Sequence, residues 1–441
     1  MIKKLLIVFI AIFAIQSYAQ EGTASPYSFY GIGSLKFKGT VENRSMGGIS
    51  VYSDSIHVNL NNPASYASKN IEAYNNESRP VKFAIGGGHT NAELKSDNGS
   101  DEVNSTTLDY LAMSFPIGKF GLGLGLIPYT SVGYKLETLN MDNDLSSQFR
   151  GKGGVNKAFT SLGYMVNDKL SLGVDFGFNF GNIENKTIEY VYTNEGTLAQ
   201  YQTREDNRSD LAGITVNLGA IYKTVLTNGF ELTTTLTYRP KSNLTSKNSR
   251  TFNTITINAA NGDEYVVNSI KADLDAEGLK ETDLALPAKL SLGAGIGQPN
   301  RWFVGAEYSL LNSSEFKNDL YESSDSAGNV TYKNASTIAV GGFFIPDYNS
   351  FSSYLKRVVY RAGIRFEGTG LNINDEDINE FGISFGLGLP MGNTNTFSNV
   401  NFGFEFGKKG TTNQNLIQEN FINFQLSLSF NDRWFQKRKF N

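Results

Sequence analysis

Two arginines four residues apart are the groups best placed to bind an anion in this 441-residue chain. Arg361 and Arg365 lie in the stretch Tyr360–Phe366, where apolar residues alternate with charged or small ones. Because side chains of a β-strand point alternately to its two faces, both guanidinium groups share the face opposite the apolar one. They could therefore hold the carboxylate of an amphipathic ligand. Ion pairs that only stiffen a barrel are the alternative, and the mixture of charges on this face favours it.

The same argument assigns further residues to the inner face of a closed sheet. Lys289 adds a cation, and Phe303 and Phe159 are candidate contacts for an apolar ligand. Charged residues that share this face are Asp175, Arg239, Glu307, Glu367 and Glu405. Together they define the candidate ligand-binding residues of the lumen.

The strands that place these side chains alternate apolar with small or polar residues. Every second residue is apolar in Ile422–Phe430, and Leu170–Phe180 and Val400–Phe406 repeat the pattern. A water-soluble β-sandwich would also alternate, but these strands are long, numerous and rich in Phe, Tyr and Leu on one face. The mean hydropathy of −0.28 hides a membrane signal because outward and inward residues average out. The sequence therefore predicts an all-β protein, a transmembrane antiparallel β-barrel.

Short and long connections alternate along the predicted strands. The tight turns lie at Gly118–Lys119, Asn167–Asp168, Asn228–Gly229 and Gln298–Asn300, and long polar segments such as Asn182–Asp210 and Lys241–Asp283 occupy the alternate positions. Outer-membrane barrels have short periplasmic turns and longer extracellular loops. The pattern predicts about 14 strands between Val81 and Phe430, with both termini in the periplasm.

Two extracellular features are predicted. Thr251–Ile270 is predicted to be a protruding hairpin around Asn261 and Gly262. Asn372–Glu380 is predicted to be an acidic loop whose oxygen atoms suit calcium, but it lacks the spacing of an EF-hand, so a solvated loop is favoured. The two histidines, His57 and His89, exclude a site that needs three. We expect no metal and no cofactor.

The first 19 residues resemble a signal peptide, with Lys3 and Lys4, an apolar run and Ala19 at the cleavage position. The chain has no cysteine, which excludes disulfides and lipoprotein attachment. The net charge of −4, made more negative by removal of the two lysines, argues against nucleic acid as a partner.

The residues after the signal peptide differ from the rest of the chain. Ser45–Tyr66 has scattered apolar positions and contains Asn62, Pro63 and Ala64, a combination that is also common in plain turns. We predict a plug, or hatch, in the lumen at residues 20–79, the barrel at 80–430 and a basic periplasmic tail at 431–441.

Four stretches are similar to the FadL/TodX-type outer-membrane transporters, particularly divergent members from Bacteroidota. They are Ser25–Gly33 followed by Asn43–Gly48, the Asn62–Ala64 triplet, Gly151–Asn156 at the start of a strand pair, and Leu286–Leu290. The resemblance implies a 14-stranded barrel with an N-terminal hatch that Asn62, Pro63 and Ala64 help to hold or release. It also implies import of hydrophobic molecules, which leave sideways through a gap in the wall.

Two functions follow as hypotheses. The first is an outer-membrane channel for hydrophobic or amphipathic small molecules, such as fatty acids, gated by the hatch. The alternative is a non-transporting FadL-like barrel that serves as an accessory subunit of an outer-membrane secretion or assembly machine, with outer-membrane or periplasmic proteins as partners. Outer-membrane lipid surrounds the barrel in both. An enzyme is not expected, because neither histidine lies in a motif with a nucleophile.

Overall fold

The computed structural model describes residues 22–54, 56–67, 80–97, 99–226, 228–258, 260–315, 330–391 and 398–432. The predicted signal peptide, residues 68–79 of the predicted hatch and residues 433–441 of the predicted tail lie outside the described residues. The boundaries between signal peptide, hatch, barrel and tail at residues 19, 79 and 430 remain predictions from the sequence. No helix in the described part is long and apolar enough to cross a membrane.

Strands make up most of the described chain, and the few helices are short. The strands are β1 (Ser34–Leu35), β2 (Val81–Ser96), β3 (Gly99–Ile117), β4 (Phe120–Pro128), β5 (Thr130–Leu139), β6 (Leu145–Met165), β7 (Leu170–Glu189), β8 (Gln202–Val225), β9 (Glu231–Arg239), β10 (Ser242–Ile257), β11 (Glu264–Lys271), β12 (Glu281–Leu286), β13 (Lys289–Gln298), β14 (Trp302–Leu311), β15 (Val330–Tyr332), β16 (Ala335–Phe344), β17 (Val359–Ile373), β18 (Glu376–Met391), β19 (Ser398–Lys409) and β20 (Gln418–Asp432). The helices are η1 (Pro26–Phe29), α2 (Val41–Arg44), η2 (Pro63–Ala67), η4 (Ser313–Glu315), η6 (Leu355–Arg357) and η7 (Asn413–Asn415).

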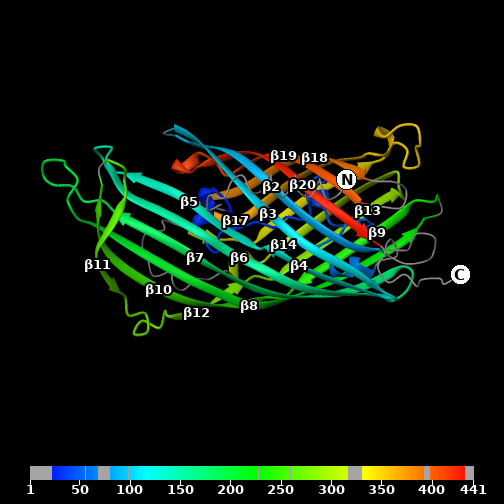
Figure 1. Cartoon of the computed structure of the whole chain (residues 1–441), viewed down its shortest axis with the longest axis horizontal. Helices are drawn as coiled ribbons and strands as arrows, with labels where there is room; N and C mark the ends of the chain where they lie inside the picture. Colours follow the sequence, from blue (N-terminus) through cyan, green and yellow to red (C-terminus); the bar gives the residue numbers. More distant parts are fainter. Residues whose placement is uncertain are drawn as a thin grey trace.

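The strands close into an antiparallel barrel of 14, as predicted (Figure 1). Four of the 14 are interrupted and carry two labels each, namely β4–β5, β9–β10, β12–β13 and β15–β16. Closure comes from β20, which pairs with β2 from Val81↔Asp432 to Lys95↔Gln418. Because Val81 lies opposite Asp432, the barrel starts and ends at the same rim.

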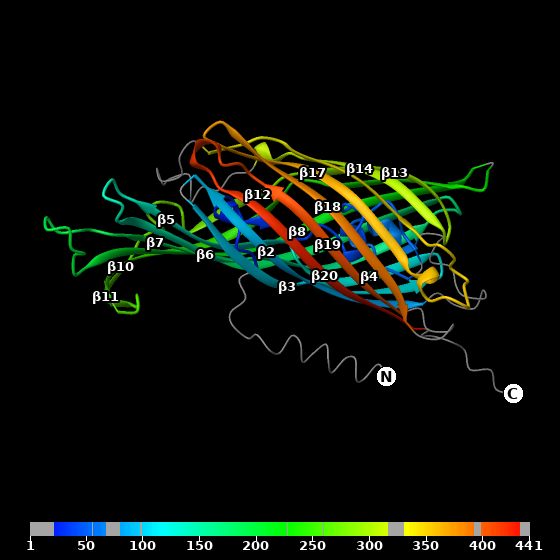
Figure 2. The ribbon, with the colours of Figure 1, turned by 90° about the horizontal axis from the view of Figure 1, so that it is seen from above.

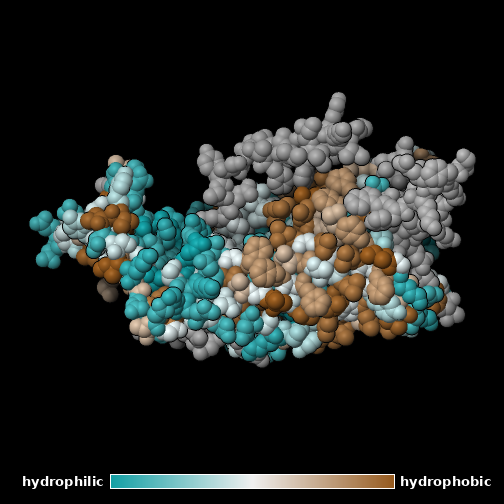
Figure 3. Space-filling view, turned by 60° about the horizontal axis from the view of Figure 1, so that its bottom comes forward, coloured by the Kyte–Doolittle hydropathy of each residue, from teal (hydrophilic) through white to brown (hydrophobic). Residues whose placement is uncertain are grey.

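Alternation places side chains on two faces as the sequence predicts. In β7, Leu172, Phe176 and Phe178 are 45%, 55% and 52% exposed, whereas Asp175 and Asn179 on the opposite face are buried. Figure 3 shows the outward apolar residues gathered in a broad band on the barrel. Such a band faces the hydrocarbon of a membrane.

Several strands continue far beyond this band. A tilted strand crosses the hydrocarbon in roughly 9–11 residues, yet β6, β7 and β8 have 21, 20 and 24. Together with β5, β10 and β11 they form a sheet that projects from one end of the barrel, which we call the extension (Figure 1). The long polar connections predicted at Asn182–Asp210 and Lys241–Asp283 are therefore mainly strand.

The observed strands also test the predicted hairpin and the predicted acidic loop. The hairpin within Thr251–Ile270 is confirmed, since β10 and β11 pair antiparallel there. Asn372–Glu380 is not a loop, because β17 and β18 run into a two-residue turn at Asn374 and Asp375, both with positive φ. No group of three or more acidic or histidine residues in the described ranges could hold a metal ion.

The wall has an incompletely paired edge where β4 meets β5. β4 pairs with β3 from Leu111↔Leu126 onward, whereas β5 pairs with β6 and, on its other side, with the N-terminal β1. The first half of β3 has no partner on that side among the described strands. A cavity lined by Thr106, Leu108, Pro128 and Gly154 lies beside this incompletely paired edge.

Candidate functional site

The candidate site is the lumen, where the described N-terminal residues meet the inner face of the wall. Figure 2 shows this segment within the ring of strands. Its helix α2 is one turn long and is capped by Thr40, whose side chain accepts a hydrogen bond from the backbone N–H of Asn43. Asn43 in turn donates to the carbonyl of Ile49 at 2.9 Å, which fixes the turn that follows the helix.

The Asn62–Pro63–Ala64 triplet starts the short helix η2 and touches the wall directly. The side-chain oxygen of Asn62 accepts from the backbone N–H of Ala64 at 3.0 Å, and its amide nitrogen donates to the carbonyl of Ala220 in β8 at 3.2 Å. Asn62 and Ala64 are both fully buried. The triplet therefore links an internal turn to the barrel wall.

Glycines of the wall make room for the backbone of the N-terminal segment. A Cβ on Gly173 would lie 2.3 Å from the nitrogen of Ala64, and one on Gly363 would lie 2.2 Å from the nitrogen of Gly47. Gly121 of β4 and Gly341 of β16 approach the backbone of the segment in the same way, and Gly219, Gly293 and Gly386 of β8, β13 and β18 make room for its side chains. Such close contact is possible only without a side chain.

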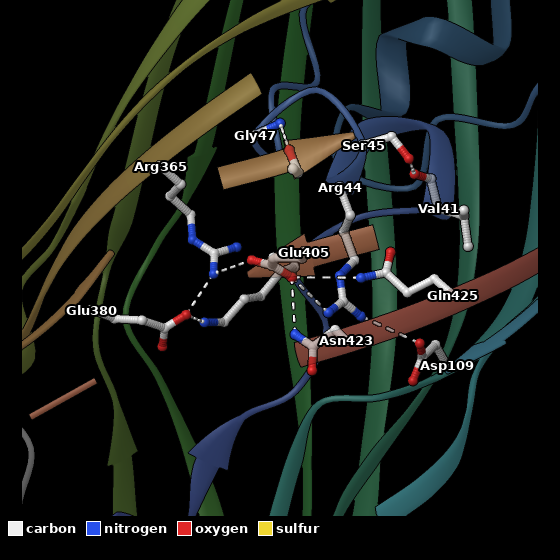
Figure 4. A network of polar contacts seen from close by, with 12 residues as sticks. Val41, Arg44, Ser45, Gly47, Asp109, Arg365, Glu380, Glu405, Asn423 and Gln425 are labelled. Atoms are coloured by element: carbon white, nitrogen blue, oxygen red, sulfur yellow. Dashed lines mark hydrogen bonds and ion pairs between the residues drawn. The ribbon is translucent and has the colours of Figure 1, made fainter. Parts of the chain in front are cut away.

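A buried network of ion pairs joins the segment to the wall (Figure 4). The carboxylate of Glu405 accepts from Arg44 of α2 at 3.1 Å and from Arg365 of β17 at 2.8 Å. Arg365 also pairs with Glu380 of β18, which receives a second cation from Lys38 of the segment. Every carboxylate in this cluster has at least two polar partners, as buried charges require.

Arg361 belongs to a second buried network. Its guanidinium donates to Asn401 at 3.1 Å, and Asn401 donates to Glu42 of α2 at 2.6 Å. Glu42 also accepts from Ser427 at 3.0 Å. Both predicted arginines therefore point inward, as expected, but each is already engaged by protein groups.

The other predicted lumen residues take different places. Phe303 is buried in a cluster with Met46, Ile49 and Val51 of the segment. Phe159 packs in another cluster with Tyr66, and the ammonium of Lys157 lies 5.9 Å from its ring centroid. Each aromatic ring thus supports the packing of the segment.

The lumen holds two cavities beside the charged cluster. The first has a volume of about 250 Å³ and is lined by both apolar and charged residues. Its apolar lining includes Tyr27, Tyr129, Leu286 and Phe421, and its charged lining includes Lys38, Arg44, Arg365 and Glu419. The second has a volume of about 210 Å³, and Lys289 lines it together with Arg239 and Glu307. Lys289 and Arg365 are therefore lumen residues, whereas Phe303 lines neither cavity.

Comparison with protein families decides the classification. The family model BamG matches residues 1–441, the full length of the chain. The chain belongs to the BamG family. No curated protein matches the sequence.

Solved structures that resemble this BamG-family chain are outer-membrane channels and transporters of the FadL type. They include the toluene transporter TbuX of Ralstonia pickettii (TM-score 0.58), the toluene transporter TodX of Pseudomonas putida (0.55) and a FadL homologue of Pseudomonas aeruginosa (0.55). Each is 14% identical in sequence, and the matches cover 90–92% of this chain and 99–100% of the other. At this identity the likeness establishes a FadL-like barrel fold, and none of these neighbours is an enzyme.

Several residues of the buried networks were missed at the level of sequence. Glu380 was assigned to an exposed extracellular loop, and that was wrong, since it is only 6% exposed and pairs with Arg365. Lys38, Glu42 and Arg44 lie in the irregular segment, where no periodicity indicates direction. One signal was present, because Arg44 lies in the Asn43–Gly48 stretch that carried the family resemblance.

Proposed function

We propose that this BamG-family chain is a non-transporting FadL-like barrel that acts as a subunit of an outer-membrane protein assembly machine. In this proposal residues 20–79 form a plug that stays in place. The observation that carries it is the close fit of the N-terminal segment. Its backbone lies against wall glycines of β4, β6, β7, β16 and β17, and its side chains lie against glycines of β8, β13 and β18. A hatch that opened during each transport cycle would have to break all these contacts.

The charged contacts support the same conclusion. Displacing α2 would separate Arg44 and Lys38 from Glu405 and Glu380, and the side chains of these acids are only 4% and 7% exposed. Breaking a buried pair on one side costs roughly 3–5 kcal/mol because a charge is left without its partner. The match of the BamG family model over the whole chain adds a second line of support for this role over transport.

A channel for amphipathic molecules is the second candidate. The first cavity favours it, because its lining combines apolar side chains with the cations Lys38 and Arg365, which suits a fatty-acid-like ligand. The unpaired edge between β3 and β5 would be the sideways exit. Asn62, Pro63 and Ala64 would then hold the hatch, while Arg361, Arg365, Lys289, Phe303 and Phe159 would be the residues that contact the ligand.

The orientation and partners are part of the proposal. We place the short turns and both termini in the periplasm and the extension outside the cell, as long extracellular and short periplasmic connections imply. An origin in Bacteroidota and a partner for the basic tail at residues 431–441 remain predictions from the sequence.

Purification of the tagged, full-length protein from native membranes in a mild detergent tests the proposal. Mass spectrometry would identify proteins and lipids that remain bound. Stoichiometric partner proteins, with lipids in the same proportions as in the membrane, are expected for an assembly subunit. A solitary barrel that carries one defined fatty acid or similar amphiphile would support the channel instead.

A further inference from the structure

The end of the extension carries a strand with a free edge. In the described chain, β11 pairs with β10 on one side and with no strand on the other. All residues of β11 after Glu264 are exposed. An open edge presents unpaired N–H and C=O groups in the spacing that another strand needs.

Apolar side chains accompany this edge although it lies far from the membrane band. Tyr265, Val266, Val267 and Ile270 are 50–62% exposed. Ile270 lies opposite Phe252 of β10, which is 41% exposed, so the pair forms a continuous apolar surface across the hairpin. Figure 3 shows an apolar patch of this kind at the hydrophilic end of the molecule, separate from the band on the barrel. Apolar groups grouped in water in this way mark an interaction site.

The hairpin is held in position by ion pairs to the sheet behind it. Glu264, the first residue of β11, pairs with Arg150 of β6 and with Arg204 of β8, the second at 2.9 Å. Arg250 of β10 pairs with Glu205 at 3.1 Å. A preformed edge binds a partner without the cost of ordering a loop.

The charge around the edge indicates the chemistry of the partner. Between residues 263 and 283 the chain has seven carboxylates and two lysines. Asp273, Asp275 and Glu277 lie directly after β11, and all three are exposed. A partner segment that combines apolar residues with a net positive charge complements this surface.

We propose that the free edge of β11 is a docking strand, to which an extended segment of another surface protein, apolar and basic, adds as the next strand. This inference rests on the proposed role as a subunit, and it names the surface through which that subunit holds a partner outside the cell. Pairing would be by main-chain hydrogen bonds, with Phe252 and Ile270 supplying the apolar contact.

Site-specific photo-crosslinking in intact cells tests the proposal on the full-length protein. A benzophenone amino acid placed at Val266, Ser269 or Lys271 should link to one partner protein. These three residues share one face of the hairpin, because they lie opposite Ile255, Asn253 and Thr251. Mass spectrometry of the linked peptides should show an apolar, basic segment of that partner. Because strands pair residue by residue, moving the probe two residues along one face should move the linked position by about two.

Two variants make the result specific. Ile270→Lys should lower the crosslinking yield at least tenfold, since it removes apolar contact and repels a basic segment. Val191→Lys is the matched control, because Val191 is also an exposed apolar residue of the extension (55%) but lies outside β11, and it should leave the yield unchanged. Heat-dependent migration in gels would verify that the barrels of both variant proteins are folded.

Links only to a second copy of this chain, links without a consistent register, or no links would overturn the docking strand. If stoichiometric partners still co-purified in that case, the subunit role would stand and only its surface would be wrong. If no partner co-purified at all, the proposed function itself would fail.

Discussion

Removal of the negative charge of Glu405 is the sharpest perturbation of the contact between the N-terminal segment and the wall. Its side chain is 4% exposed and accepts from Arg44 and Arg365. Glu405→Gln keeps the size of the side chain and removes the charge. We expect the N-terminal segment to separate from the wall more often in this variant.

The magnitude follows from the distances. Two unit charges 3.1 Å apart, as in the Arg44–Glu405 pair, attract by about 5 kcal/mol at an effective dielectric constant of 20. Some attraction is retained, because Arg44 keeps Asp109 at 3.4 Å and Arg365 keeps Glu380. We therefore expect a loss of about 2 kcal/mol, below the roughly 3–5 kcal/mol for a fully unpaired buried charge. This is about a 30-fold change in the equilibrium between bound and released segment.

Cysteine labelling measures this equilibrium, because the chain has no native cysteine. Ser45 is 1% exposed and lies against Gly386, so a cysteine there reacts with a maleimide only when the segment moves away. Glu405→Gln should raise the labelling rate of the Ser45→Cys protein about 30-fold. Asp377→Asn, which breaks the exposed pair with Lys333, should change it less than twofold. A rate in Glu405→Gln within twofold of the parent, in a folded barrel, would refute the claim that the ion pairs hold the segment.

Three further outcomes are expected. Gly173→Ala should lower the temperature at which the barrel unfolds in gel-shift assays, because its Cβ meets backbone at 2.3 Å, whereas Gly368→Ala, with no atom nearer than 3.5 Å, should leave it nearly unchanged. Phe303→Ala should cost about 3–5 kcal/mol in urea unfolding, and Val304→Ala on the lipid face should cost less. Partial burial favours the neutral form of Glu264, but hydrogen bonds from two arginines outweigh it and lower its pKa. This stabilisation is present above the pKa of about 4.3 in an unfolded chain and is lost as the pH falls through the lowered value. Protease sensitivity of the hairpin should rise in that range, and Glu264→Gln should abolish this pH dependence.

The sequence predicted the barrel and the inward face because the membrane imposes alternation on every spanning strand. The inward direction of Arg361 and Arg365 and the burial of Phe303 followed from that period of two. The strands of the extension at Asn182–Asp210 were not predicted, because both faces of a sheet in water can be polar and the sequence there shows no alternation.

The contacts of the N-terminal segment could not be predicted in the same way. Arg44 reaches Glu405 across 361 residues of sequence, and no repeat in an irregular segment indicates such a partner. The wall glycines leave room for a close neighbour, but which segment each one meets depends on the closed barrel.

A disulfide between the segment and the wall tests most directly whether the plug must move. Leu35 and Thr130 are cross-strand neighbours in the β1–β5 pair and suit a cysteine pair at the open edge of the wall. If the chain is a non-transporting subunit, cells with the oxidised Leu35→Cys/Thr130→Cys protein should assemble other outer-membrane barrels as well as cells with the reduced form. Uptake of labelled fatty acid that stops on oxidation and returns on reduction would contradict this account and identify a channel gated by its hatch.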